Sequence, residues 1–254
     1  MLYQPNRTTV LTSATLESGY YLNTIGFPDN GIIAEPKPSP FDYAHHAVMY
    51  LSENLPYPTK ENRKEYLNTA ISEIVHLLEI THGKTLILFT AKQDLDYVYK
   101  KLSNMGLPYK LIRQSPVSSQ EHQLERFRKD TNSVILGTGI YWEGINVVGD
   151  ALSQVIVYRL PFPVPDPILE YKMSLAENPL DEVIIPEMLI KLRQGTGQLI
   201  RSDTDTGIIS ILDPRARNKR YSQIIRDTLP FPNITENIED VQRFWGRLHS
   251  EGDG

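Results

Sequence analysis

The stretch Leu192–Ile211, LRQGTGQLIRSDTDTGIISI, decides how the rest of the chain is interpreted. It follows an apolar-periodic run and finishes in a β-branched run, with polar residues and glycines between them. Spacings of three and four residues predict that one helical face carries Gln194, Gly197, Gln198 and Arg201. An arginine on a polar face beside a glycine can approach a phosphate, because a guanidinium pairs with phosphate oxygens in a fixed fork. A solvated helix followed by a turn is the alternative.

Length and composition describe an ordinary globular protein. The chain has 254 residues, 40% of them hydrophobic and 22% charged, which predicts one or two domains with a sizeable core. No apolar run approaches the roughly 20 residues that cross a membrane, and the first residues lack the pattern of a signal peptide. We therefore expect a cytoplasmic protein without membrane contacts.

The absence of cysteine and the net charge narrow the chemistry that the chain can perform. The chain has no cysteine, which excludes disulfides, cysteine nucleophiles and thiolate-bound metal within it. The formal net charge is −5, so any contact with nucleic acid must be a local groove rather than a global basic field. The basic run between Arg215 and Arg226 is the one positive cluster, although such runs are usually solvated faces.

Helical and strand patterns alternate between residues 61 and 213, which predicts an α/β unit with a mainly parallel sheet. The expected helices cover residues 61–78, 92–105 and 120–129. The expected strands cover residues 84–90, 109–112, 133–136, 153–160 and 208–212. We also expect a short strand at 8–16, a helix that Pro186 begins, and a last helix carrying Phe244 and Trp245.

The segment His82-Gly83-Lys84-Thr85 looks like part of a phosphate-binding P-loop, but its context argues against one. The motif needs an earlier glycine where Leu78 stands, and it must lie between a strand and a following helix. Here a helix is expected before the segment and a strand after it. The sequence has no other match to this motif.

Polar residues at expected strand ends are better placed for binding, because ligands of open α/β sheets gather at the carboxyl ends of strands. Thr90 and Lys92 follow one strand, and Thr138 lies between two glycines after another. Such residues can contact a nucleic-acid backbone, with the Thr138 hydroxyl as an extra donor. A helix cap and a solvated lysine are the simpler alternatives at the first two positions.

Several of these segments together resemble motifs of the DinG/XPD-like superfamily 2 DNA helicases. Leu192–Ile211 is similar to motif VI, QxxGRxxR followed by an acidic turn and a strand, except that Gln198 replaces an arginine. Thr12–Thr15 resembles motif III and Thr90–Lys92 motif IV. Trp142–Asn146, followed by Gly149-Asp150, resembles motif V. The segments SPF at 39–41 and LDPR at 212–215 also match the family.

The resemblance implies the second RecA-like domain of such a helicase, a three-layer α/β fold with a mainly parallel sheet that lacks its own P-loop. It implies that residues 1–38 end the first RecA-like domain and form a linker. Residues 39–232 would then form the second RecA-like domain, and residues 233–254 a C-terminal helix and frayed tail. We expect the chain to be a fragment of a longer protein or a subunit that needs a partner.

The resemblance also implies the site residues. Arg201 would be the arginine finger, with Gln194, Gln198 and Glu143 as further catalytic residues. Glu143 would hold a motif VI arginine or the water around the nucleotide, or be a plain loop carboxylate. The residues expected to surround the nucleotide are Gly144, Asn146, Gly197 and Asp205. Nucleic acid would contact Thr90, Lys92 and Thr138, and Ser13 and Thr15 would couple the nucleotide state to the second domain.

The implied cofactor is ATP with Mg²⁺, whose P-loop and metal ligand would come from an N-terminal RecA-like half, in cis or in trans. The implied partner is single-stranded DNA. Because glutamine has no positive charge, Gln198 predicts an ATPase that is weak for its family. A non-catalytic module that binds single-stranded DNA or a partner protein is the alternative. A separate nucleoside-phosphate enzyme is disfavoured, since no phosphate cradle or base–nucleophile pair is visible.

Overall fold

The computed structural model describes residues 8–11, 22, 24–28, 30–35, 39–115, 117–130, 132–145, 147, 149 and 151–250. The chain divides into two compact units, which we describe separately. One comprises Met1–Pro40 and Phe162–Ile190, and the other comprises Phe41–Pro161 and Lys191–Gly254. No helix of the described part is long and apolar enough to span a membrane.

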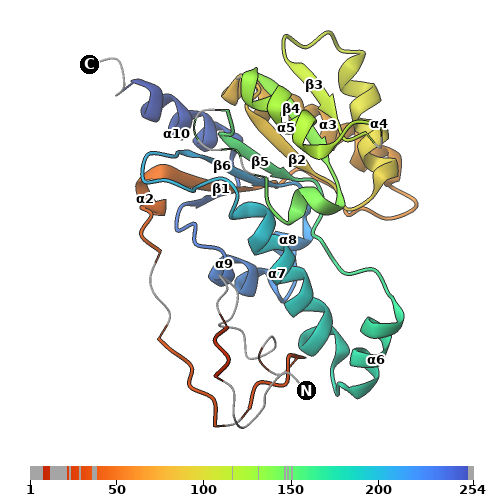
Figure 1. Ribbon diagram of the computed structural model, residues 1–254. Helices are drawn as coiled ribbons and strands as arrows, with labels where there is room; N and C mark the ends of the chain where they lie inside the picture. The colour runs from red at the N-terminus through yellow and green to blue at the C-terminus, as the bar shows by residue number, and fades with distance from the viewer. Residues whose placement is uncertain are drawn as a thin grey trace. The chain divides into compact units, whose positions relative to one another are not determined.

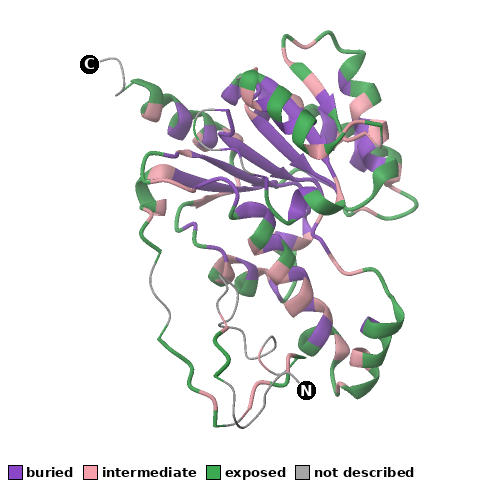
Figure 2. Ribbon diagram, in the orientation of Figure 1, coloured by how far each residue is buried: buried purple, intermediate pink, exposed green. Residues whose placement is uncertain are grey.

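The larger unit is built on a seven-stranded sheet in the order β3-β4-β2-β5-β6-β1-β7, in which every pair is parallel (Figure 1). The strands are β1 (Ala47–Leu51), β2 (Thr85–Leu88), β3 (Lys110–Arg113), β4 (Ser133–Gly137), β5 (Gln154–Val157), β6 (Gly207–Ile211) and β7 (Ile234–Thr235). The central strands are buried on both faces, which explains their continuous apolar sequences (Figure 2). The α/β fold with a parallel sheet is therefore confirmed.

Helices cover both faces of this sheet, and α8 and α9 lie on the opposite side from α10 (Figure 1). The helices of this unit are α2 (Tyr43–His46), α3 (Arg63–Thr81), α4 (Lys92–Ser103), α5 (Gln120–Lys129), α8 (Arg215–Asn218), α9 (Ser222–Thr228) and α10 (Ile238–Ser250). The apolar stripe of α3 packs with residues of α4 and α10 against one face of the sheet. The last helix carries Phe244 and Trp245 as expected.

The order of elements around His82–Thr85 confirms the rejection of a P-loop. Helix α3 ends before this segment and β2 begins at Thr85, so the polarity is opposite to the one the motif needs. Both His82 and Lys84 have positive φ angles, of 52° and 46°. The segment is a tight helix-to-strand turn.

The smaller unit contains α6 (Pro167–Leu175), the π-helical turn η2 (Leu180–Ile184) and the first residues of α7 (Ile185–Thr196). The expectation that Pro186 begins a helix is wrong in its boundary. The N–H of Ile185 bonds to the carbonyl of Leu180, so helical backbone starts several residues upstream. Pro186 therefore lies within continuous helical backbone, and its missing N–H leaves one upstream carbonyl without that donor where the π-helical turn passes into α7.

The strand expected at residues 8–16 is not present in its described part. Residues 8–11 form no strand, and Val10 is 83% exposed. A strand needs a neighbour to pair its backbone groups, and no described segment pairs with these residues. The remaining positions, including Ser13 and Thr15, lie outside the described residues.

Candidate functional site

The residues expected to contact nucleic acid lie at one edge of the sheet, because parallel strands end at the same edge. Thr90 and Lys92 follow β2, and both are exposed. Thr138 follows β4, the neighbour of β2. The Thr138 N–H and hydroxyl both donate to Oε1 of Gln114, at 2.7 and 2.9 Å. The hydroxyl is thus already bonded within the chain.

The loop after Thr138 is the short 3₁₀ helix η1 (Gly139–Trp142), and it packs against the end of α7. The indole N–H of Trp142 donates to the carbonyl of Phe89 at 2.9 Å. Gly195 lies against the same indole, since a Cβ at this position would be 2.6 Å from the Trp142 ring. This close contact holds the segment resembling motif V against the segment resembling motif VI.

Helix α7 ends at Thr196, so the expected single helical face through residue 201 is wrong. The Thr196 hydroxyl bonds to the Leu192 carbonyl at 2.9 Å, and Gly197 follows as a helix-ending residue. The chain then turns inward and buries Leu199 and Ile200. A spacing of three and four residues cannot distinguish a continuing helix from such a turn.

Gln198 points into the protein and is 1% exposed. Its Oε1 accepts from the N–H of Ile145 at 2.7 Å, while its Nε2 donates to the carbonyls of Tyr141 and Gly195 at 2.9 and 3.1 Å. The side chain therefore ties the loop after η1 to the end of α7. Sequence reasoning predicted a loss of charge here and missed these three bonds.

Arg201 is half-buried, and its guanidinium has no hydrogen bond or ion pair with the part of the chain that the structure describes. Its Nη2 would lie 3.7 Å from a Cβ on Gly144, whose φ of +127° favours glycine. Burial lowers the pKa of Arg201, and the Asp205 carboxylate partly opposes this effect. The guanidinium remains charged at neutral pH, since its ordinary pKa is so high. An unpaired, positioned cation of this kind suits an anionic ligand.

Asp205 fixes the backbone around Arg201. Its Oδ2 accepts from the N–H groups of Arg201 and Ser202, both at 2.8 Å, and its Oδ1 accepts from the Gly149 N–H at 3.3 Å. The residue is 7% exposed. The carboxylate is thus committed to main-chain groups of two loops, and the structure gives it a positioning role.

The other expected site residues that the structure describes are exposed. Gln194 is exposed in the last turn of α7, and Gly197 is exposed directly after it. Glu143 is exposed at the end of η1, and its carboxylate makes no hydrogen bond or ion pair with a described residue. Asn146 lies outside the described residues.

Sequence reasoning missed a cluster at the ends of β2 and β5. Asp94, in the first turn of α4, bonds to Arg63 at 2.6 Å and lies 3.5 Å from Arg159. The Arg159 guanidinium also stacks over the Tyr66 ring at 4.8 Å from its centroid. The sequence offered one indication of this cluster, a polar residue near the end of a strand. Asp94, Arg63 and Arg159 lie too far apart in sequence for a local pattern to connect them.

The basic run after β6 proves to be paired. Arg217 and Arg226 both form ion pairs with Glu236, at 3.0 and 3.1 Å. The Lys219 ammonium lies 5.2 Å from the centroid of the Tyr57 ring. Much of the positive charge of this run is therefore paired with side chains of the domain itself.

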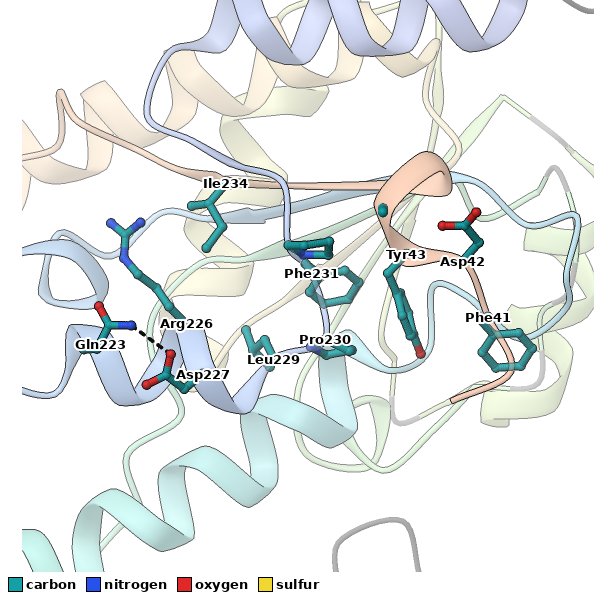
Figure 3. Close-up of a pocket in the computed structure, with 12 residues that line it drawn as sticks. Phe41, Asp42, Tyr43, Gln223, Arg226, Asp227, Leu229, Pro230, Phe231 and Ile234 are labelled. Atoms are coloured by element: carbon teal, nitrogen blue, oxygen red, sulfur yellow. Dashed lines mark hydrogen bonds between the residues drawn. The ribbon is translucent and has the colours of Figure 1, made fainter. Parts of the chain in front are cut away.

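A hollow of about 560 Å³ is lined by residues that include Phe41 of the SPF segment (Figure 3). Its walls come from residues 41–44, which precede β1, and from residues 229–232, which precede β7. The Tyr43 and Phe231 rings meet edge to face at 5.4 Å between centroids, and Gln223 bonds to Asp227 on the opposite wall. The amino ends of β1 and β7 therefore contribute this hollow, whereas the motif residues follow carboxyl ends.

Comparison with protein families gives a match to the helicase C-terminal domain over residues 74–236, more than half of the chain. The chain belongs to this family. Among curated relatives, the ATP-dependent DNA helicase YoaA of Haemophilus influenzae is 30% identical across 92% of this chain and 37% of its own length. The 3′-5′ exonuclease DinG of Bacillus subtilis is 30% identical across 89% of this chain and 26% of its own length. This helicase C-terminal domain therefore spans about a third of the relatives it matches.

Solved structures support the RecA-like fold of the domain. An XPD helicase superposes with a TM-score of 0.60 at 18% identity, covering 75% of this chain and 35% of that one. Dbp5 of S. cerevisiae, bound to RNA and ADP BeF3, gives 0.52 at 13% identity, covering 82% and 46%. At such identities the likeness establishes the fold alone. The expected kinship with DinG/XPD-like helicases is confirmed.

Proposed function

We propose that this domain is the C-terminal motor domain of an ATP-dependent DNA helicase of the DinG type, and that Arg201 is its arginine finger. The observation that carries the proposal is the half-buried guanidinium beside Gly144, which has no partner among the residues that the structure describes. The relatives named above include ATP-dependent helicases, which supports ATP as the anionic ligand. An N-terminal RecA-like half, in cis or in trans, supplies the P-loop and the Mg²⁺ ligand.

ATP hydrolysis spreads negative charge over the oxygens of the transferred phosphoryl group. A guanidinium fixed in advance stabilises that charge without having to reorganise at the moment of reaction. Asp205 supports this role by holding the main chain of Arg201 and Ser202. Gln194 and Glu143 are exposed near the same segments and can hydrogen-bond to the nucleotide or its water. The loop positions Gly144, Asn146 and Gly197 surround the nucleotide in this proposal.

The carboxyl edge of β2 and β4 is our proposed part of the single-stranded DNA track. Thr90 and Lys92 are exposed there, and Lys92 has no ion pair with the described residues. A lysine without a partner can neutralise a backbone phosphate and release its counterion. Thr138 belongs to the same edge.

The test is ATP hydrolysis stimulated by single-stranded DNA, measured with this chain alone and mixed with the P-loop half of a DinG-type relative. We expect turnover only in the mixture. In that mixture Arg201→Lys, which keeps the charge but loses the guanidinium fork, should lower kcat by about a thousandfold. Arg126→Gln, an exposed arginine on α5, is the control and should leave kcat unchanged. Full activity of the Arg201→Lys mixture would contradict the proposal.

A second candidate, a module that grips single-stranded DNA with little or no ATPase, is favoured by the neutral side chain at Gln198. Gln198→Arg restores the family's charge but removes the acceptor for the Ile145 N–H, because arginine only donates. We therefore expect a lower melting temperature together with a higher kcat in the mixture. An unchanged kcat would show that charge at this position does not limit turnover.

A further inference from the structure

Gln114 directly follows β3, and its amide orientation is fixed by its partners. Its Oε1 accepts from the Thr138 N–H at 2.7 Å and from the Thr138 hydroxyl at 2.9 Å. A main-chain N–H can only donate, so the amide oxygen rather than the nitrogen must face Thr138. The main-chain N–H of Gln114 donates to the carbonyl of Leu136 at 2.9 Å, and this hydrogen bond also anchors the residue to β4.

The consequence is an unused donor at the edge of the sheet. The Nε2 group of Gln114 has no acceptor among the described residues, and it is not buried from solvent. The Thr138 hydroxyl has already given its proton to Gln114, so it has none to offer a phosphate oxygen, which only accepts. The free donor of this pair is therefore the amide nitrogen of Gln114.

A second, buried glutamine holds the surroundings of this pair. Gln123 is 2% exposed, and its Nε2 donates to the carbonyls of Ser115 and Ser118 at 3.3 and 2.8 Å. Its Oε1 accepts from the Tyr141 hydroxyl at 2.9 Å. Gln123 thus ties the loop after Gln114 to the helix after Thr138. The segment that carries the donor is therefore held on both sides by a buried side chain.

The strand order places this donor in line with the proposed DNA contacts. Gln114, Thr138 and Thr90 follow β3, β4 and β2, which are consecutive neighbours in the sheet. Adjacent strands are about 4.8 Å apart, so the row spans roughly 10 Å along the edge. Lys92 lies beyond Thr90 at the start of α4.

We propose that Gln114 is a direct ligand of single-stranded DNA, donating a hydrogen bond from Nε2 to a backbone phosphate oxygen, and that Thr138 is the residue that positions it. The proposal rests on the proposed function, because it needs this edge to carry the DNA. It assigns the contact to an uncharged amide, so the bond adds affinity without releasing a counterion.

The test measures the affinity of this chain for single-stranded DNA as a function of salt concentration, with thermal unfolding of each variant. Gln114→Glu keeps an oxygen for Thr138 but replaces the donor with an acceptor, and it should weaken binding by about tenfold or more at an unchanged melting temperature. Gln114→Met, which adds no charge, should also weaken binding and leave the salt slope unchanged. Gln242→Glu, on the exposed side of α10, is the matched charge control and should bind like the wild type.

Two further variants separate the roles of the pair. Thr138→Val keeps the main-chain N–H that holds Gln114, so it should lose less affinity than Gln114→Glu. Lys92→Gln should lower the salt slope by about 0.7, which is the signature of a lost phosphate contact to a single strand.

The outcomes distinguish this inference from the proposed function. Normal binding by Gln114→Met together with a large loss for Thr138→Val would overturn it, because Thr138 would then be the donor. Equal weakening by Gln114→Glu and Gln242→Glu would overturn it too, since charge alone would explain the loss. If the wild-type chain does not bind single-stranded DNA at all, the proposed track fails and this inference fails with it.

Discussion

At the scale of single residues, the site depends on side chains that bind main-chain groups rather than ligands. Asp205 and Gln198 together bond to six backbone groups, in segments that are separated by about fifty residues in sequence. Buried polar groups of this kind are costly to leave half-satisfied. Asp205 thus holds the main chain at Arg201 directly, and Gln198 ties the turn before Arg201 to the loop after η1.

Asp205→Asn tests this dependence. One amide oxygen can replace Oδ2, but the amide nitrogen would then face the Gly149 N–H, donor against donor. We expect a loss of about 1–3 kcal/mol in the free energy of unfolding, measured by urea denaturation. Asp203→Asn changes the same charge at an exposed position of the same turn, and its effect should stay within about 0.5 kcal/mol. Equal effects of the two variants would show that charge, not hydrogen bonding, matters here.

Motif positions were predictable at this scale, whereas side-chain partners were not. The pattern around Arg201 predicts a phosphate-binding arginine because of guanidinium chemistry, and this role stays a prediction. Gln114 was missed because its partner Thr138 lies 24 residues away, and only the register of β3 against β4 brings them together. Gln198 was recognised as a substitution, but nothing in the sequence shows that its side chain turns inward.

At the scale of elements, apolar pattern located most helices and strands, and turns set their limits. Helix α5 matches its expected range, because a charged helix with an apolar stripe has a clear period. Sequence analysis assigned no strand to Ala47–Leu51, where a short continuous apolar run has no period that distinguishes strand from helix. Strand β7 has only two residues, Ile234–Thr235, which are too few to show a sequence pattern. Its pairing with β1 is visible only in the folded structure.

Gly195 makes the contact between α7 and η1 testable, and a second helical glycine, Gly246, serves as the control. A Cβ at Gly195 would lie 2.6 Å from the Trp142 ring and 2.9 Å from Leu88, so Gly195→Ala must displace packed atoms. We expect it to destabilise the domain by about 1–3 kcal/mol in urea denaturation. Gly246, in α10, has nothing within 4 Å of such a Cβ, and Gly246→Ala should stabilise by about 0.5–1 kcal/mol. A shift in the same direction for both variants would contradict this account.

At the scale of the whole molecule, the net charge is −5, and Glu236 pairs with both Arg217 and Arg226 of the basic run. In the proposed function, local contacts at the carboxyl ends of β2, β4 and β3 hold single-stranded DNA, and they include neutral donors. The parallel α/β sheet was predictable from the alternation of elements, and its RecA-like type was implied by the resemblance of the motifs. The division into two units was not, because residues 162–190 join the N-terminal segment only in three dimensions.

The core also predicts how the whole molecule responds to alkali. Burial raises the pKa of Tyr50, Tyr66 and Tyr158 above the usual value near 10, and it raises the pKa of Tyr141 to about 12. The unfolded chain therefore releases these protons at lower pH than the folded chain does. Stability should be fully present below pH 10 and should fall as the pH rises from about 10 to 12, by up to about 1.4 kcal/mol per pH unit for each tyrosine.

Urea denaturation at pH 8, 10 and 11 measures this slope, and Tyr141→Phe assigns part of it. That variant loses the bond to Gln123, so it should be less stable at pH 8 by about 1 kcal/mol. It also lacks one titrating group, so its stability should fall less steeply above pH 10 than that of the wild type. Parallel curves for the two proteins would mean that Tyr141 ionises alike in both states. The Tyr141 hydroxyl, which donates to Gln123, would then be more exposed to water than this hydrogen bond indicates.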